Sequence, residues 1–130
     1  MDTTPTVVFV CAHGAAKSVL AATDFERLAR ARGRPFRAIA RGTDPDPEMA
    51  PRVAAALLRE GQDLRGHRAQ RVTPEELASA WKVVSFGEDL AGLAPAGRAI
   101  IRWDDIPAVS DDFQRAREAI AARLPVLLDS

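Results

Sequence analysis

The chain has 130 residues, of which 47% are hydrophobic and 28% are charged. This composition excludes a disordered, collagen-like or fibrous chain and predicts one globular domain over residues 1–130. The 18 Lys and Arg residues balance 18 Asp and Glu residues, which argues against nucleic-acid binding through bulk positive charge, so we expect no nucleic-acid partner.

The N-terminal residues Met1–Thr4 lack the basic and apolar regions of a signal peptide, and no apolar run reaches the roughly 18 residues of a membrane span. We therefore expect a cytoplasmic protein with no membrane partner. The run Thr6–Val10 is apolar without polar alternation, which predicts a strand covered on both faces. Apolar residues then recur at helical spacing through Val19–Arg32, which predicts a helix that Gly33 ends.

A second strand is predicted over Phe36–Ala40, and the segment Gly42–Pro51, rich in Pro and Asp, is predicted to be a loop. The next helix is expected to begin at Pro51 and to stop at Gly61. Residues Gln62–Val72 are polar and are expected to be irregular. The buried stripe of this helix is predicted to comprise Val53, Ala54, Leu57 and Leu58.

In the second half of the chain, Thr73 and Glu76 form a capping box that predicts a short helix ending at Ala80. Two further strands are predicted over Lys82–Phe86 and Arg98–Trp103. A cap and two acids at positions 110–112 predict the start of a last helix, which Pro125 should end or kink. Its buried face is predicted to comprise Phe113, Ala116, Ile120 and Leu124.

This order of elements predicts right-handed crossovers and a single three-layer α/β domain, with a central, mainly parallel four-stranded sheet and helices on both faces. Ligands of such sheets bind beyond the carboxyl ends of the strands. The loop Cys11–Ser18 directly follows the first predicted strand. It is therefore the candidate binding loop.

Small residues in this loop let the backbone curl, so that several N–H groups can turn inward, and the helix N-terminus that follows favours an anion. Cys11 begins the loop, in surroundings that favour a nucleophilic thiolate. Lys17 adds a cation, and the Ser18 hydroxyl can donate to the thiolate. We predict a tetrahedral oxyanion above Cys11. The residues expected to bind it are Ala12, His13, Gly14, Ala15, Ala16, Lys17 and Ser18.

The pattern of strand, Cys, five residues, Lys, Ser and helix resembles the low-molecular-weight protein tyrosine phosphatases and the arsenate reductases that share their fold. In that family the cysteine attacks phosphorus, the loop N–H groups and an Arg bind the phosphate, and a later Asp protonates the leaving group. The resemblance implies a cysteine-dependent phosphohydrolase that works through a thiophosphate on Cys11, without metal or cofactor. It continues through Arg41-Gly42-Thr43, Gly61–Leu64, Gly66–Arg68, Val83–Gly87 and Arg102–Asp104.

The sequence departs from the family pattern inside the loop. Lys17 stands where the family has Arg, although 16 of the 18 basic residues of this chain are Arg. Arg would offer two parallel donors to a phosphate, whereas Lys is a point charge. Gly14 stands where many members have Asn. His13 either holds the loop by a hydrogen bond or touches the substrate, and His67 and Trp81 are expected to be structural.

The sequence also departs from the family where the general acid is expected. The family's Asp-Pro pair is absent, and Asp104 and Asp105 precede Pro107 instead. Neighbouring side chains in an extended segment point opposite ways, so one of the two at most can face the thiol and act as general acid. There is no tyrosine, so the aromatic wall that many family members use for phosphotyrosine is absent or built differently.

Three functions therefore stay open. The first is a phosphatase acting on a phosphoprotein or a small phosphomonoester. The second is an arsenate reductase; since the chain has one cysteine, an internal disulfide relay is excluded and an external thiol would have to be its partner. The third is a non-catalytic module that binds an oxyanion such as phosphate or arsenate.

Overall fold

The computed structural model describes residues 4–64 and 66–130; residues 1–3, on which the expectation about a signal peptide rests, lie outside that range. Its centre is a four-stranded sheet in the order β2-β1-β3-β4, and every neighbouring pair is parallel. The strands are β1 (Thr6–Cys11), β2 (Arg37–Gly42), β3 (Lys82–Ser85) and β4 (Ile101–Arg102). The predicted parallel four-stranded sheet is confirmed.

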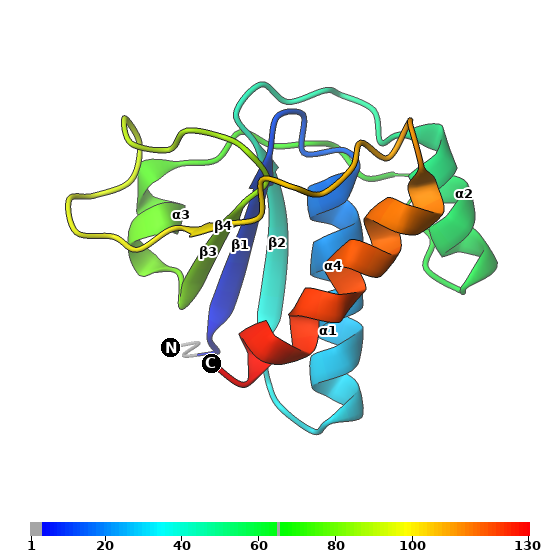
Figure 1. The fold of residues 1–130 in the computed structure, drawn as a ribbon, viewed down its shortest axis with the longest axis horizontal. Helices are drawn as coiled ribbons and strands as arrows, with labels where there is room; N and C mark the ends of the chain where they lie inside the picture. The colour runs from blue at the N-terminus through cyan, green and yellow to red at the C-terminus, as the bar shows by residue number, and fades with distance from the viewer. Residues whose placement is uncertain (1–3, 65) are drawn as a thin grey trace.

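Helices cover both faces of this sheet, as predicted (Figure 1). The helices α1 (Lys17–Ala31), α2 (Pro51–Arg59) and α4 (Phe113–Leu128) share one apolar core, and α3 (Pro74–Ser79) packs on the other face. The strand β1 explains the unbroken apolar run in the sequence. Its side chains alternate between the two cores, with Val7 and Phe9 in the larger and Val8 and Val10 in the smaller.

Two expectations about the helices need correction. Leu58 is 40% exposed, because α2 turns Val53, Ala56 and Leu57 toward the core instead. Of the two alternatives for Pro125, the end of the helix is wrong, because α4 continues to Leu128, and the kink stays a prediction. Leu127 and Leu128 in its last turn are buried, and this burial offsets the hydrogen bond that Pro125 cannot donate.

The carboxyl ends of the three longest strands meet at one edge of the sheet. In the register, Cys11 at the end of β1 pairs with Gly42 at the end of β2, and Ser85 at the end of β3 pairs with Val10. The loops that follow these strands therefore lie next to one another. Within the described ranges, no helix combines the length and the apolar character that crossing a membrane requires.

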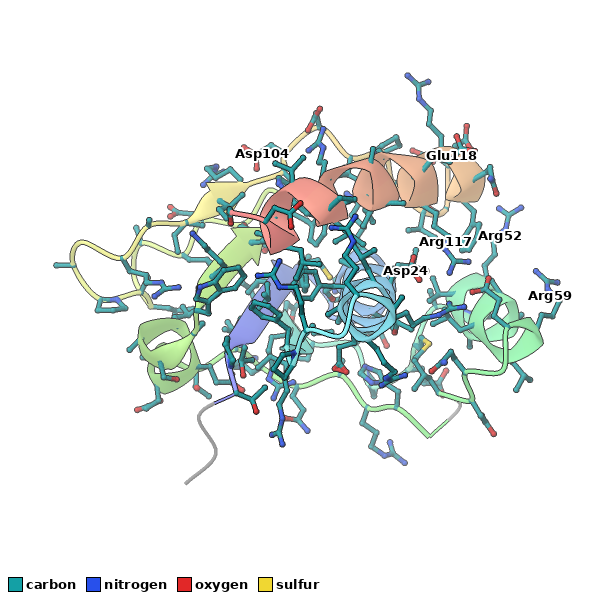
Figure 2. All side chains as sticks on the ribbon, turned by 90° about the horizontal axis from the view of Figure 1, so that it is seen from below. Asp24, Arg52, Arg59, Asp104, Arg117 and Glu118 are labelled. Atoms are coloured by element: carbon teal, nitrogen blue, oxygen red, sulfur yellow. The ribbon has the colours of Figure 1, made fainter. Side chains whose placement is uncertain are left out.

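An ion-pair network joins the three helices of the larger core. Arg117 on α4 donates to Asp24 on α1 at 3.0 Å and to Glu60, just after α2, at 2.5 Å, and Arg27 donates to Glu60 at 2.7 Å. Figure 2 shows Asp24 and Arg117 facing each other between α1 and α4. The hydrogen bonds from Arg117 and Arg27 lower the pKa of Glu60 from 4.5 to about 2.

This network predicts a pH-dependent stability. Because the folded state lowers the pKa of Glu60, its contribution is complete above 4.5 and is lost as the pH falls toward about 2. Glu60→Gln should therefore lower the free energy of unfolding at neutral pH by about 1 kcal/mol, with the difference from wild type vanishing in acid. Urea unfolding at several pH values measures it. Glu118→Gln is the control, since Glu118 accepts a hydrogen bond from the neutral Gln114 and no ion pair with it is seen among the described residues. An equal loss of stability in Glu118→Gln would contradict the assignment.

Candidate active site

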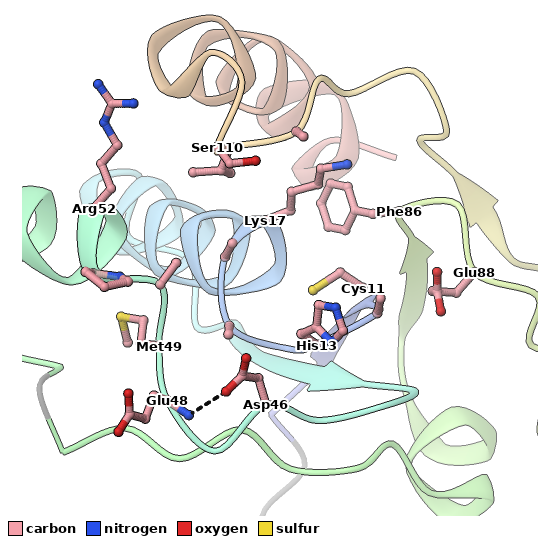
Figure 3. A pocket seen from close by; sticks show the side chains of 17 residues that line it. Cys11, His13, Lys17, Asp46, Glu48, Met49, Arg52, Phe86, Glu88 and Ser110 are labelled. Carbon is pink, nitrogen blue, oxygen red and sulfur yellow. Dashed lines mark hydrogen bonds between the residues drawn. The ribbon is translucent and has the colours of Figure 1, made fainter.

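A cleft of about 820 Å³ opens at the carboxyl ends of the strands. Figure 3 shows the side chains that line it. They come from residues 11–13 and 15–17 at and after the end of β1, from residue 46 and residues 48–52 before and within α2, from residues 86 and 88 after β3, and from residues 108–110 before α4. The cleft thus lies where parallel α/β folds bind ligands, and the predicted loop forms its base.

The loop after β1 is held with its carbonyl groups facing outward. Backbone N–H groups of residues 43–50 donate to four of these carbonyls, in the pairs Thr43 to Cys11 at 3.2 Å, Asp44 to Ala12 at 2.7 Å, Asp46 to His13 at 3.0 Å and Ala50 to Ala15 at 3.0 Å. All peptide bonds described are trans. Since the C=O and N–H groups of a trans peptide point in opposite directions, the corresponding N–H groups turn toward the centre of the loop.

Two glycines make this close packing possible. Gly14 has a φ of +63°, and a Cβ there would lie 2.9 Å from the Gly42 nitrogen. A Cβ on Gly42 would in turn lie 2.8 Å from the carbonyl carbon of His13. Glycine reaches such a φ without the strain that a Cβ would bring. Gly14 therefore adopts, as a residue without a side chain, the conformation for which many members of the family that this sequence resembles use Asn.

Cys11 lies at the base of the loop with only 7% of its surface exposed. Its Sγ accepts a hydrogen bond from the Gly14 N–H at 3.2 Å and lies 3.0 Å from Oγ of the fully buried Ser18. A thiolate can only accept, so with Cys11 ionised both contacts stabilise the negative charge. The structure thus brings Ser18 to Cys11, as the sequence predicted.

Lys17 lies at the start of α1 and lines the cleft, but its ammonium group reaches beyond the loop. Its Nζ donates to the backbone carbonyl of Ile106 at 3.1 Å. Figure 3 shows the side chain extending toward the segment that carries Ser110. Lys17 therefore connects the binding loop to the segment before α4, a contact that the spacing of the sequence did not reveal.

Asp104 and Asp105 are not brought to Cys11, and neither lines the cleft. Asp104 accepts from Arg102 at 3.0 Å, and Asp105 accepts from Arg123 on α4 at 2.6 Å. The hydrogen bond from Arg123 lowers the pKa of Asp105. The segment 103–109 is anchored by Trp103, Ile106 and Val109, which are buried. Both carboxylates consequently point toward arginines on the surface.

The structure also assigns places to the two histidines. Nδ1 of His13 lies 3.0 Å from the backbone oxygen of Asp44, and the residue lines the cleft. Nε2 of His67 lies 3.4 Å from the backbone oxygen of Gly14, so His67 contacts the one loop carbonyl among residues 11–15 that no described backbone N–H takes up. Trp81 packs on Phe36 with ring centroids 4.7 Å apart, far from the cleft residues in the fold.

Four charged residues that the sequence analysis did not single out line the cleft, namely Asp46, Glu48, Arg52 and Glu88. Only the sheet register, which brings the segments after β2 and β3 beside the loop, could have identified them. In the part of the chain that the structure describes, no group of three or more His, Cys, Asp or Glu side chains is arranged to hold a metal ion.

Comparison with known proteins gives a family match. A family model described as low molecular weight phosphotyrosine protein phosphatase matches residues 6–100. No curated protein sequence matches the chain. Among solved structures, a low molecular weight protein tyrosine phosphatase from T. tengcongensis is 19% identical, with a TM-score of 0.84 over 97% of this chain and 99% of that chain.

Two other solved structures have the same fold. The thioredoxin-dependent arsenate reductase of Corynebacterium glutamicum is 23% identical, with a TM-score of 0.77 over 97% of this chain and 61% of that chain. Wzb of Vibrio vulnificus, in complex with benzylphosphonate, is 13% identical, with a TM-score of 0.76 over 95% of this chain and 96% of that chain. At these identities the likeness establishes the fold.

The contact between the two glycines can be tested by Gly14→Ala, with Gly33→Ala as the matched control. Gly33 has a similar φ of +66°, but nothing lies within 4 Å of a Cβ there. Both variants should lose stability because an alanine is strained at a positive φ, and only Gly14→Ala should also distort the loop. We expect Gly14→Ala to lose about 1–3 kcal/mol of unfolding free energy and to bind phosphate at least about tenfold more weakly. Equal phosphate affinities in calorimetry would contradict the packing argument.

The contact of Lys17 can be tested by Lys17→Met. Loss of a charge-assisted hydrogen bond worth about 1.5 kcal/mol should speed amide hydrogen exchange in residues 104–110 and weaken phosphate binding about tenfold. Lys82→Met is the matched control, because Lys82 is the second of the two lysines in the chain. It begins β3, at the end of the strand away from the cleft. Unchanged exchange and unchanged affinity in Lys17→Met would show that Lys17 serves neither the loop nor the anion.

Proposed function

Because the chain belongs to the low molecular weight phosphotyrosine protein phosphatase family and is a cysteine-dependent phosphatase, we propose that it hydrolyses phosphomonoesters through a thiophosphate on Cys11. The observation that carries this assignment of Cys11 is the outward orientation of the loop carbonyls. It turns the loop N–H groups inward, next to the N-terminus of α1, where they could donate to the equatorial oxygens of a phosphoryl group on Cys11.

The reaction proceeds in two displacements. In the first, the Cys11 thiolate forms an S–P bond while the P–O bond to the leaving group breaks, and the loop N–H groups hold the charge of the transition state. In the second, water forms an O–P bond, inorganic phosphate leaves, and the electron pair of the S–P bond returns to Cys11. Ser18 and the Gly14 N–H stabilise the thiolate at the beginning and at the end of the cycle.

The walls of the cleft favour a leaving group with an apolar part. Phe86, Met49 and Val109 are buried hydrophobic residues that line it. An aryl or alkyl phosphate, free or on a phosphoprotein, would bury apolar surface against them. A catalytic thiolate also requires a reducing compartment, which supports the cytoplasm as the location of the protein.

Arsenate has the tetrahedral shape of phosphate, and the same N–H groups would bind it. A Cys11–arsenate adduct could not be resolved by another cysteine of this chain, because Cys11 is its only one. Reduction would therefore need an external thiol such as glutathione or mycothiol as a partner. Release of arsenite in the presence of such a thiol tests this second function.

The phosphatase assignment predicts that Cys11→Ser abolishes hydrolysis of an aryl phosphate, with a loss of at least about a thousandfold in kcat, because the variant lacks the nucleophile. The same variant should still bind inorganic phosphate, since the loop N–H groups stay in place. Phosphate release and titration calorimetry measure the two effects. Wild-type protein that binds phosphate but never hydrolyses the ester would identify a non-catalytic oxyanion-binding module instead.

A further inference from the structure

Departure of a basic leaving oxygen from a phosphomonoester is accelerated by a general acid, and a group that lines the cleft could supply the proton. Asp104 and Asp105, the expected donors, pair with Arg102 and Arg123 outside the cleft. The segment before α4 instead presents Ala108, Val109 and Ser110 to the cleft, and these residues carry no acid. A general acid provided by the protein would therefore have to come from another element.

His13 has the geometry of a proton-transfer residue. It belongs to the same loop as Cys11, is exposed and lines the cleft (Figure 3). The backbone oxygen of Asp44, 3.0 Å from Nδ1, can only accept a hydrogen bond, so Nδ1 carries a proton. This contact orients the imidazole and leaves Nε2 as the nitrogen that gains or loses a proton.

The partner of His13 is itself fixed. The Asp44 N–H donates to the Ala12 carbonyl at 2.7 Å, while the Asp44 carbonyl accepts from His13. Residue 44 therefore bonds both to the binding loop and to the imidazole. Movement of the ring away from Cys11 would break its contact with Asp44, so the position of the imidazole is coupled to that of the loop.

Two of the three carboxylates that line the cleft, Asp46 and Glu88, accept hydrogen bonds from described residues. Glu88 accepts a hydrogen bond from the Thr43 hydroxyl, and Asp46 accepts one from the Glu48 N–H at 3.1 Å. Imidazole also changes its protonation state near neutral pH more readily than an ordinary carboxylic acid. The other titratable or charged groups that face the cleft are Cys11, Lys17, Asp46, Glu48, Arg52 and Glu88.

We propose that His13 is the general acid and base of the phosphatase reaction, an inference that rests on the proposed function. In the first displacement the imidazolium gives its Nε2 proton to the leaving oxygen as the P–O bond breaks, and His13 becomes neutral. In the second, neutral His13 takes a proton from the attacking water as the S–P bond breaks. The imidazolium is restored. Nδ1 keeps its proton throughout and continues to donate a hydrogen bond to the backbone carbonyl of Asp44.

The test compares a series of aryl and alkyl phosphates whose leaving groups differ in basicity. His13→Asn keeps an amide donor for the Asp44 carbonyl but has no group to titrate. It should lose about 100-fold or more in kcat/KM on poor leaving groups and much less on good ones, so that the rate depends more steeply on leaving-group basicity. The decline of the wild-type rate with rising pH on poor leaving groups should be absent in His13→Asn.

Two variants provide the comparison. His67→Gln retains an amide donor for the Gly14 carbonyl and should affect all leaving groups equally, because His67 does not line the cleft. Asp105→Asn should leave the leaving-group dependence as in wild type. The proposal would be overturned if the rate of Asp105→Asn depended more steeply on leaving-group basicity than that of wild type while the rate of His13→Asn did not. Such a result would show that the segment before α4 closes during turnover. Failure of wild type to hydrolyse even the best leaving group would refute the proposed function itself, independently of His13.

Discussion

The hydrogen bonds between the binding loop and residues 43–50 determine the rest of the site. Each backbone hydrogen bond contributes only about 0.5–1.5 kcal/mol, but four of them act on consecutive or nearly consecutive carbonyls of one short loop. Together they orient the peptide planes, so that the donors needed by an oxyanion are in place before it arrives. The close approach that these bonds require is possible because Gly14 and Gly42 have no Cβ.

This arrangement lets backbone groups supply most of the donors of the oxyanion site, and Lys17 adds a positive charge to them. Preorganised N–H groups and the N-terminus of α1 supply the positive potential. Lys17 can therefore replace the family's Arg and still donate to the Ile106 carbonyl, where it holds a second loop against the first. The substitution changes the geometry of one cation and leaves the ring of backbone donors intact.

The segment before α4 lacks the Asp-Pro pair of the family pattern, and the match to the family model ends at residue 100, before this segment begins. Arg123 and Arg102 draw its two carboxylates to the surface, while Ile106 and Val109 bury its apolar side chains. The ion pairs of Asp104 and Asp105 and the burial of Ile106 and Val109 both keep the two carboxylates out of the cleft. The loop after β1 consequently brings more titratable side chains to the cleft, namely Cys11, His13 and Lys17, than this segment does.

The sequence by itself determined the fold of this protein and singled out the loop that forms the base of the cleft. The unbroken apolar run of β1, the capping box of α3 and the Cys-x5-Lys-Ser pattern are local signals, because hydrogen bonding and periodicity within a few residues produce them. Only the tertiary structure decided which groups the side chains of Lys17, Asp104 and Asp105 contact. It also decided that Leu58 is exposed. A long side chain can reach several partners, and which one it meets depends on segments distant in sequence, such as the carbonyl of Ile106, 89 residues beyond Lys17.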